Sequence, residues 1–243
     1  MRVAVVSDIH GNLTALEAVL ADLRDTAPDL VVQGGDLAAS GSRPAEVIDA
    51  IRDLGWPGVV GNTDEMLWNG AGLENLRARV ASLRALVDSL FEVARITADV
   101  IGPARLAWLR SLPSRWSGED VTVVHASPDT LWRSPSVESP DEDLAGTYAG
   151  LGTATVVYGH IHRPFVLTVA GLTVANSGSV SLSYDGDPRA SYALVDEDGV
   201  AIRRVAYDIE REARQLVQMR YPMADWIGTL LRTGTYVPPP ADR

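Results

Sequence analysis

The chain of 243 residues contains no cysteine and no lysine. Without cysteine neither a disulfide nor a thiolate ligand can form, so any metal ion would be bound through nitrogen and oxygen atoms. All 21 basic residues are arginine, against 32 acidic residues, which gives a net charge of −11 and a pI near 4.7. A chain without a basic surplus is unsuited to broad binding of nucleic acids or of anionic membranes.

Long hydrophobic runs are also missing from the sequence. No segment approaches the length of a membrane span, and the N-terminal run Val3–Val6 is too short for the core of a signal peptide. We therefore expect a cytoplasmic protein that does not bind membranes. A hydrophobic content of 46% is still enough for a full core, and it predicts a single domain over residues 1–243.

Short β-branched runs alternate with stretches of helical period, which is typical of an α/β fold. Five of the runs end in side chains that can bind a metal or a phosphate. The runs are RVAVVSDIH (ending at Asp8 and His10), LVVQGGD (Asp36), PGVVGNTD (Asn62 and Asp64), VTVVHA (His125) and ATVVYGHIH (His160 and His162). We interpret each run as a buried strand, and these endings include all four histidines of the chain.

Residues at the carboxyl ends of strands in an α/β sheet gather at one edge, where binding sites form. Taken singly, each residue has a simpler explanation: an Asp at a strand end can cap a helix, and His125 can be a hydrogen-bonded core residue. Chance does not explain why every histidine of the chain, together with two aspartates and an asparagine, follows a predicted strand. Seven candidate ligands are too many for one tetrahedral zinc ion, and imidazole with carboxylate suits a pair of divalent ions such as Mn, Fe, Zn, Co or Ni.

The ordered motifs Asp8-Ile-His10, Gly35-Asp36, Gly61-Asn62-Thr63-Asp64, His125 and Gly159-His160-Ile161-His162 resemble the signature of the calcineurin-like metallophosphoesterase superfamily. The resemblance extends from Met1 to about Asp196 and is strongest to the small bacterial and archaeal phosphodiesterase branch. It implies a four-layer α-β-β-α sandwich of two mixed sheets, the metallo-dependent phosphatase fold. It also implies that the turn Asn176–Val180 lies near the site.

The resemblance further assigns roles to the candidate ligands. Asp8, His10 and His162 would hold one ion, Asn62, His125 and His160 the other, and Asp36 would bridge the two. The implied activity is hydrolysis of a phosphodiester by a metal-bridging hydroxide that attacks phosphorus in line. Asp36, Asn62 and Asp64 are the predicted catalytic residues. The predicted substrate is a small phosphoester, with nucleotide-like compounds among the candidates.

Other activities remain open at this point. Within the class, the alternatives are a phosphomonoesterase and a dinucleoside polyphosphate hydrolase. From other classes come a non-catalytic protein-binding scaffold of the same fold and a metal-dependent amidohydrolase. A scaffold is expected to lose ligands, whereas every ligand position is filled here. The amidohydrolase barrel usually has a first-strand His-x-His and a lysine or its substitute, and this chain has Asp-x-His and no lysine.

The sequence departs from the superfamily pattern at Thr63, where a histidine usually protonates the leaving oxygen. All four histidines are already assigned to metal, so Asp64, water or nothing is left for this role. We therefore expect a preference for diesters, or for stabilised leaving groups, over alkyl monoesters. For Asp64 the alternative is an N-cap of a helix that starts near Glu65.

Two weaker substrate-binding candidates are Asn12 and Arg163. Asn12 could contact a substrate phosphate or cap the helix that starts at Leu13. Arg163 offers a bidentate fork for a phosphate, or it pairs with an acidic residue at the surface.

Helices are also predicted on either side of the last motifs. Residues 65–110 form a predicted helical insertion with a narrow apolar seam: Leu73, Leu76, Val80, Leu83, Val87 and Leu90. We interpret the seam as a helix packed on its own domain, with a lid or a homo-oligomer contact as the alternatives. Residues 208–243 are predicted to add a C-terminal helical extension and a loose tail.

Overall fold

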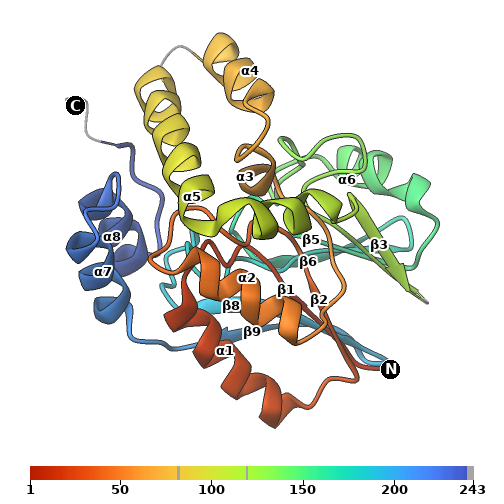
Figure 1. Ribbon diagram of the computed structural model, residues 1–243. Coiled ribbons are helices and arrows are strands. Elements are labelled where there is room, and N and C mark those ends of the chain that lie inside the picture. The colour runs from red at the N-terminus through yellow and green to blue at the C-terminus, as the bar shows by residue number, and fades with distance from the viewer. Residues whose placement is uncertain (81–82, 119, 240–243) are drawn as a thin grey trace.

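The described residues of the computed structural model, 1–80, 83–118 and 120–239, form two sheets flanked by helices (Figure 1). The first sheet has the order β2-β1-β8-β9 and the second β3-β4-β5-β7-β6. The strands are β1 (Val3–Val6), β2 (Leu30–Gln33), β3 (Arg115–Gly118), β4 (Val121–Val124), β5 (Thr155–Tyr158), β6 (Phe165–Val169), β7 (Leu172–Asn176), β8 (Ala190–Asp196) and β9 (Gly199–Val205).

Both sheets are mixed. In the first, β1 runs parallel to β2 and antiparallel to β8. In the second, β4, β5 and β7 are parallel, while β3 and β6 are antiparallel edges. The parallel strands β1, β2, β4 and β5 carry the motif residues just beyond their carboxyl ends. This pairing therefore brings those residues to one edge of the sandwich.

Alternate residues of the central strands face different apolar layers. Val3 and Val5 of β1 pack between the two sheets, whereas Ala4 and Val6 pack toward the helices. In the second sheet, Val157 lies in the layer between the sheets and Val156 in a third layer with α6. Strands that are buried on both faces need side chains that pack on both sides, which explains the valine-rich runs VAVV of β1 and VTVV of β4.

The helices make up the outer layers. They are α1 (Leu13–Thr26), α2 (Pro44–Asp53), α3 (Asn62–Glu65), α4 (Ala71–Arg79), α5 (Arg84–Ser111), α6 (Asp141–Tyr148), α7 (Ile209–Gln218) and α8 (Ala224–Thr233), with the short 3₁₀ helix η2 (Ala149–Leu151). The predicted start of α1 is confirmed, because the Asn12 side chain accepts the amide of Ala15 at 2.9 Å. Pro44 is the first residue of α2, where its fixed φ and missing N–H suit a helix start. The predicted four-layer α-β-β-α fold is thus confirmed.

The structure differs from the sequence-based expectations in two places. The run before Asn62 forms no strand among the described residues and makes only one bridge, between Gln33 and Gly58. The apolar seam of the insertion is not one helix but is divided between α4 and α5, because the backbone of Val80 is extended (φ −127°, ψ 91°). A further turn at Gly102 (φ 73°) and Pro103 kinks α5.

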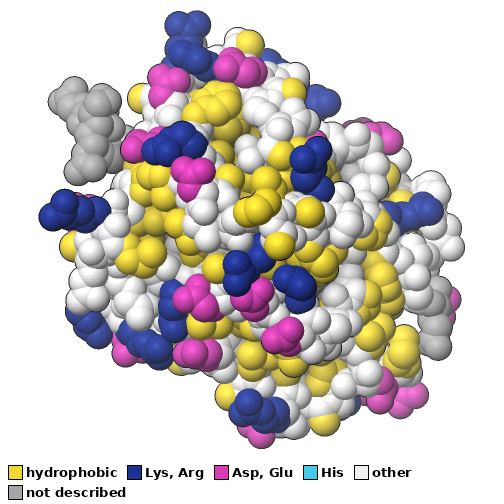
Figure 2. Space-filling view, viewed as in Figure 1, with side chains coloured by type: hydrophobic (Ala, Val, Ile, Leu, Met, Phe, Trp, Pro, Cys, Tyr) yellow, Lys and Arg dark blue, Asp and Glu magenta, His cyan; other side chains and the backbone are white. Residues whose placement is uncertain are grey.

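The C-terminal region forms α7 and α8, which pack on each other, and α7 also contacts α1 (Figure 1). The end of the predicted tail, 240–243, lies outside the described residues. No helix among the described residues is long and apolar enough to cross a membrane. On the face seen in Figure 2, basic and acidic side chains are interspersed with apolar ones, and none of the four histidines shows.

A partly buried group of hydrogen bonds joins Asp22 of α1 to the first sheet. Its carboxylate accepts the Tyr192 hydroxyl at 2.6 Å and two bonds from the Arg203 guanidinium at 2.8 and 3.2 Å. Hydrogen bonds from Arg203 hold the pKa of Asp22 below its usual range.

We expect Asp22→Asn to lower the free energy of unfolding at pH 7 by about 1–3 kcal/mol, because hydrogen bonds to a charged group are lost. An aspartate in an unfolded chain ionises near pH 3.9, and the folded pKa is lower. The advantage of the wild type is thus present above about pH 4 and lost as the pH falls through the folded pKa. Urea unfolding at pH 7 and in acid should show the two proteins converge. If the difference in the free energy of unfolding persists in acid, the substitution acts through side-chain packing and not through the charge of Asp22.

Candidate metal centre

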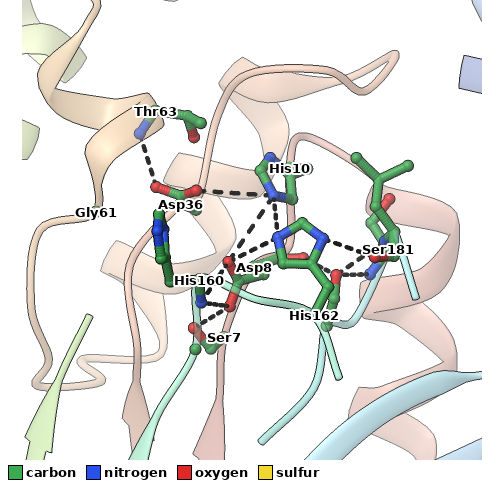
Figure 3. A network of polar contacts seen from close by, with 12 residues as sticks. Ser7, Asp8, His10, Asp36, Gly61, Thr63, His160, His162 and Ser181 are labelled. Carbon is green, nitrogen blue, oxygen red and sulfur yellow. Dashed lines mark hydrogen bonds and ion pairs between the residues drawn. The ribbon is translucent and has the colours of Figure 1, made fainter. Parts of the chain in front are cut away.

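The predicted ligands come together at the edge of the sandwich that carries the carboxyl ends of the parallel strands (Figure 3). Asp8 and His10 follow β1, Asp36 follows β2, His125 follows β4, and His160 and His162 follow β5. Asn62 is the first residue of α3. Residues from five segments far apart in the chain thus meet, as the sequence predicts.

One group consists of Asp8, His10, Asp36 and His162, all buried, with ligand atoms within 4.8 Å of one another. His162 Nε2 lies 3.0 Å from Asp8 Oδ1 and 3.2 Å from His10 Nε2. His10 Nε2 lies 3.9 Å from Asp8 Oδ1 and 3.8 Å from Asp36 Oδ2. Two imidazoles and two carboxylates therefore face one small volume.

A second group lies on the other side of Asp36. Asn62 Oδ1 is 2.8 Å from His125 Nε2 and 2.9 Å from His160 Nδ1. His125 Nε2 is also 3.4 Å from Asp36 Oδ1, the oxygen that accepts the Thr63 amide at 2.8 Å. The two oxygens of Asp36 thus face different groups, Oδ2 the first and Oδ1 the second.

Three of the imidazoles are fixed from behind by backbone carbonyls. The bonds join Nδ1 of His10 to Ala39 O (2.9 Å), Nδ1 of His125 to Gly34 O (2.9 Å) and Nδ1 of His162 to Leu182 O (2.6 Å). Because a carbonyl oxygen can only accept, these bonds place the hydrogen on Nδ1 and leave Nε2 as a lone pair. Such outer hydrogen bonds orient histidines that bind metals.

With the hydrogens placed in this way, atoms that can only accept a hydrogen bond face one another. The Nε2 lone pairs of His10 and His162 are 3.2 Å apart, and His125 Nε2 faces the Asn62 oxygen at 2.8 Å. Such pairs repel unless a cation lies between them. Neutral imidazole, carboxylate and amide oxygen form a donor set for divalent transition ions. The residues therefore fit the metal that the sequence predicts.

The backbone at this edge adopts an uncommon conformation. Asp8, His10, Asp36, His160 and His162 all have positive φ, between 51° and 67°. Left-handed backbone costs roughly 1–2 kcal/mol for a residue with a Cβ, and such strain clusters at functional sites. Five of the seven predicted ligands therefore share a conformation that residues with a Cβ seldom adopt.

Burial and mutual proximity shift the pKa values of these groups. Burial lowers the pKa of His10, and burial together with the neighbouring His125 lowers that of His160 to about 4. Burial alone would raise the pKa of Asp8, but the imidazoles around it, led by His162, outweigh this effect and lower it. Burial also acts to lower the pKa of His125, but the charges of Asp36 and Asp8 outweigh it and raise that pKa. Metal binding requires ionised carboxylates and neutral imidazoles, so it competes with protons for these groups.

Asp64 is completely buried and contacts the backbone rather than the open side of the site. Its two oxygens accept the amides of Asp36 (2.8 Å), Leu37 (2.9 Å), Ala38 (3.3 Å) and Gly61 (3.1 Å). Burial and the Asp36 charge raise its pKa to about 7, against the lowering effect of these amides. These contacts favour a role in positioning Asp36, and a role in proton transfer stays a prediction.

The alternative role of Asp64 as a helix N-cap needs correction. The helix starts at Asn62, its N-cap is Gly61, and Asp64 lies inside its first turn. The reason is that the Asp64 carboxylate reaches back to the Gly61 amide while its own residue is already helical.

Asn12 and Arg163 have protein partners in this structure. Asn12 is buried; its oxygen caps α1, and its amide nitrogen donates to Ser181 Oγ at 3.1 Å. Arg163 forms an exposed ion pair with Glu138 at 2.6 Å. The contacts favour the simpler interpretation of each residue, and their binding of substrate stays a prediction.

Sequence reasoning missed the residues that support the ligands. Ser7 Oγ donates to Asp8 Oδ2 at 2.6 Å, and Ser179 Oγ donates to the Asp8 carbonyl at 2.8 Å. The Tyr184 ring stacks on the His162 ring, with centroids 4.7 Å apart. Ser179 lies in the turn Asn176–Val180, which the resemblance placed near the site, so that motif carried a signal. Nothing local in the sequence indicates Tyr184.

Known proteins resemble this chain in sequence and in fold. The family model described as "Calcineurin-like phosphoesterase superfamily domain" matches residues 1–199. An uncharacterized protein of Methanocaldococcus jannaschii is 31% identical over 257 residues, covering 96% of this chain and 98% of that protein. The crystal structure of a metallophosphoesterase from Sphaerobacter thermophilus is 30% identical with a TM-score of 0.77, covering 97% and 99% of the two chains. A hypothetical protein from Pyrococcus horikoshii, 19% identical with a TM-score of 0.81 and coverage of 97% and 99%, shares the fold.

Proposed function

We propose that this chain, which belongs to the calcineurin-like phosphoesterase superfamily, hydrolyses phosphodiester bonds with two divalent metal ions. The family is metal-dependent, and the described residues include a buried Asp and His cluster that could bind metal. The proposed ions are drawn from Mn, Fe, Zn, Co and Ni, because the donors are nitrogen and oxygen without sulfur. The proposed substrate is a small phosphodiester.

The observation that carries the proposal is the position of Asp36. Its Oδ2 lies 3.8 Å from His10 Nε2 in the first group, and its Oδ1 lies 3.4 Å from His125 Nε2 in the second. A carboxylate whose oxygens face two sets of ligands is the arrangement that a pair of adjacent ions requires. A single ion would leave one set of inward-facing imidazoles without a partner.

In this proposal each group of residues has a separate task. Asp8, His10 and His162 hold one ion, Asn62, His125 and His160 hold the other, and Asp36 contacts both. When bound, the ions would supply a hydroxide nucleophile near neutral pH and positive charge for the phosphoryl oxygens. The Thr63 amide fixes Asp36, and the His160 amide, at 3.2 Å from both Asp8 oxygens, fixes Asp8. The protein thus holds its charged groups rigidly before the substrate arrives.

Metal content measured together with hydrolysis tests the proposal. Protein loaded with Mn²⁺ or Zn²⁺ and freed of excess ion should contain about two ions per chain and should hydrolyse small phosphodiesters. His10→Ala and His160→Ala remove one predicted ligand each from different groups, so each variant should retain about one ion. Activity should fall in both variants, and a chelator should abolish it in the wild type.

The controls separate loss of metal from loss of fold. Thermal unfolding of the metal-free variants should stay close to that of the metal-free wild type. One ion in the wild type, or the same ion lost from both variants, would contradict the two-ion assignment. A metal-loaded wild type that hydrolyses no phosphoester would contradict the enzymatic function and favour a binding scaffold.

A further inference from the structure

A cavity of about 350 Å³ lies between α4 and the segment that follows β4. Its described lining comes from both walls: Gly72, Asn75, Leu76, Arg79 and Val80 from α4 and its end, and Thr130, Trp132 and Arg133 from the segment. Pockets for small organic ligands are typically about 300–1,000 Å³ and combine apolar surface with a few polar groups. The cavity is therefore large enough for one ring system with its substituents.

Both walls of the cavity continue from predicted metal ligands. The segment with Trp132 begins just after His125, and α4 follows α3, which starts at Asn62. A hydrogen bond joins the segment to α3: Trp132 Nε1 donates to Oε2 of Glu65 at 2.7 Å, and Glu65 is the last residue of α3. In Figure 1, α4 stands directly beyond α3. The cavity is thus linked to the second ligand group through α3, which starts at Asn62, and through the segment that follows His125.

The Trp132 indole is held in one orientation. Its N–H is fixed by Glu65, and its ring lies against Gly72, where any added Cβ would overlap the ring atoms. The Trp132 amide also donates to Thr130 Oγ1 at 3.1 Å, which fixes the start of the wall. A ring held from two sides can offer a flat surface to a ligand at little cost in entropy.

The charge of the cavity is opposite to that of the protein. Its described lining contains Arg79 and Arg133 and no acidic residue, in a chain with a net charge of −11. Neither arginine forms an ion pair with any residue that the structure describes. Both are exposed, so their guanidinium groups can reach a ligand. A flat aromatic surface beside two guanidinium groups suits a ligand with a planar ring and a phosphate.

We propose that this cavity binds the nucleotide part of the substrate, with the base on Trp132 and a non-scissile phosphate at Arg79 and Arg133. The proposal rests on the proposed function, because it places the scissile phosphate at the metal centre. It makes the substrate a nucleotide-containing phosphodiester that carries at least one further phosphate. It also gives α4 of the predicted insertion a role in substrate selection.

Equilibrium binding tests the proposal without turnover. The probes are ADP, UDP and inorganic phosphate, titrated by calorimetry into metal-loaded protein. The wild type should bind ADP or UDP at least about 10-fold more tightly than phosphate. Trp132→Ala should weaken nucleotide binding by about 10-fold to 100-fold, the range for loss of a base stacked on an aromatic ring. Arg79→Gln with Arg133→Gln should weaken nucleotide binding to a similar extent. In Trp132→Ala, the binding of inorganic phosphate to the metal centre should stay within about twofold of the wild type.

Matched variants keep the test sharp. Arg77→Gln removes the same charge from α4, but Arg77 is paired with Asp88 and does not line the cavity, so it should change nothing. Trp132→Phe keeps an aromatic ring but loses the bond to Glu65 and part of the ring surface, so it should retain more of the nucleotide affinity than Trp132→Ala.

Three results would overturn the proposal: nucleotides that bind no better than phosphate, unchanged affinity in Trp132→Ala, or equal loss for nucleotide and phosphate. The last would mean that Trp132 acts only on the metal centre through Glu65. An inactive wild type that still binds nucleotide at Trp132 would contradict the proposed phosphodiesterase function and leave the binding site in place.

Discussion

Replacing Asp36 with asparagine is expected to slow phosphodiester hydrolysis by about 10³-fold or more and to reduce bound metal below two ions per chain. Metal ions contribute several kcal/mol of charge stabilisation to the transition state, and about 4 kcal/mol corresponds to 10³-fold. Asp36 is the residue whose two oxygens face both ligand groups, so its neutralisation affects both ions. Metal analysis and steady-state kinetics on the same samples measure the two effects.

The variant is expected to fold normally. Asparagine retains an oxygen that can accept the Thr63 amide, which Asp36 Oδ1 accepts at 2.8 Å. A matched control is Asp99→Asn on the exposed surface of α5, where Asp99 pairs with Arg95, and this change should leave metal content and rate unaltered. An Asp36→Asn protein that keeps both ions and the full rate would remove Asp36 from the bridging position.

The sequence predicts much of this site because its ligands follow buried strands. Val3–Val6 and Val121–Val124 are buried on both faces, so their valine-rich runs locate the strands. The polar residues that follow locate the edge. The prediction was wrong for the run before Asn62, which makes a single bridge yet still delivers Asn62 to the site. The chain before Asn62 is buried but does not pair as a strand. The two valines, Val59 and Val60, suit a buried strand and a buried segment without strand pairing equally well.

Contacts between distant segments could not be predicted in the same way. Trp132 meets Glu65, and Tyr184 meets His162, through packing that depends on how loops cross the sheet edge. The seam from Leu73 to Leu90 has ideal spacing for one helix, but the extended backbone of Val80 divides it between α4 and α5. Local periodicity therefore identified the elements that carry the ligands and did not identify the walls of the cavity beside them.

The absence of a histidine at position 63 leads to the second large effect, a steep dependence of rate on the leaving group. A positioned general acid contributes about 10²–10⁴-fold, and this advantage is greatest for leaving groups that depart as strong bases. Thr63 cannot supply it, because an alcohol is a poor proton donor near neutral pH. Its Oγ1 is also buried, without a hydrogen-bond partner among the described residues. We expect aryl phosphodiesters to react far faster than alkyl phosphodiesters, with a steep fall in kcat/KM as the leaving-group pKa rises. Alkyl monoesters should be poor substrates.

Two substitutions at this position separate the proton donor from the packing. Thr63→Val removes the hydroxyl and keeps the shape, so it should leave the leaving-group dependence unchanged. Thr63→His introduces an imidazole beside Asp36 and should raise kcat/KM for alkyl phosphodiesters by about 10-fold or more, with little effect on aryl phosphodiesters. A shallow dependence in the wild type, or a selective loss of alkyl activity in Thr63→Val, would show that a proton donor already acts there. The hydroxyl of Thr63 would then have to turn from its buried position toward the substrate during turnover.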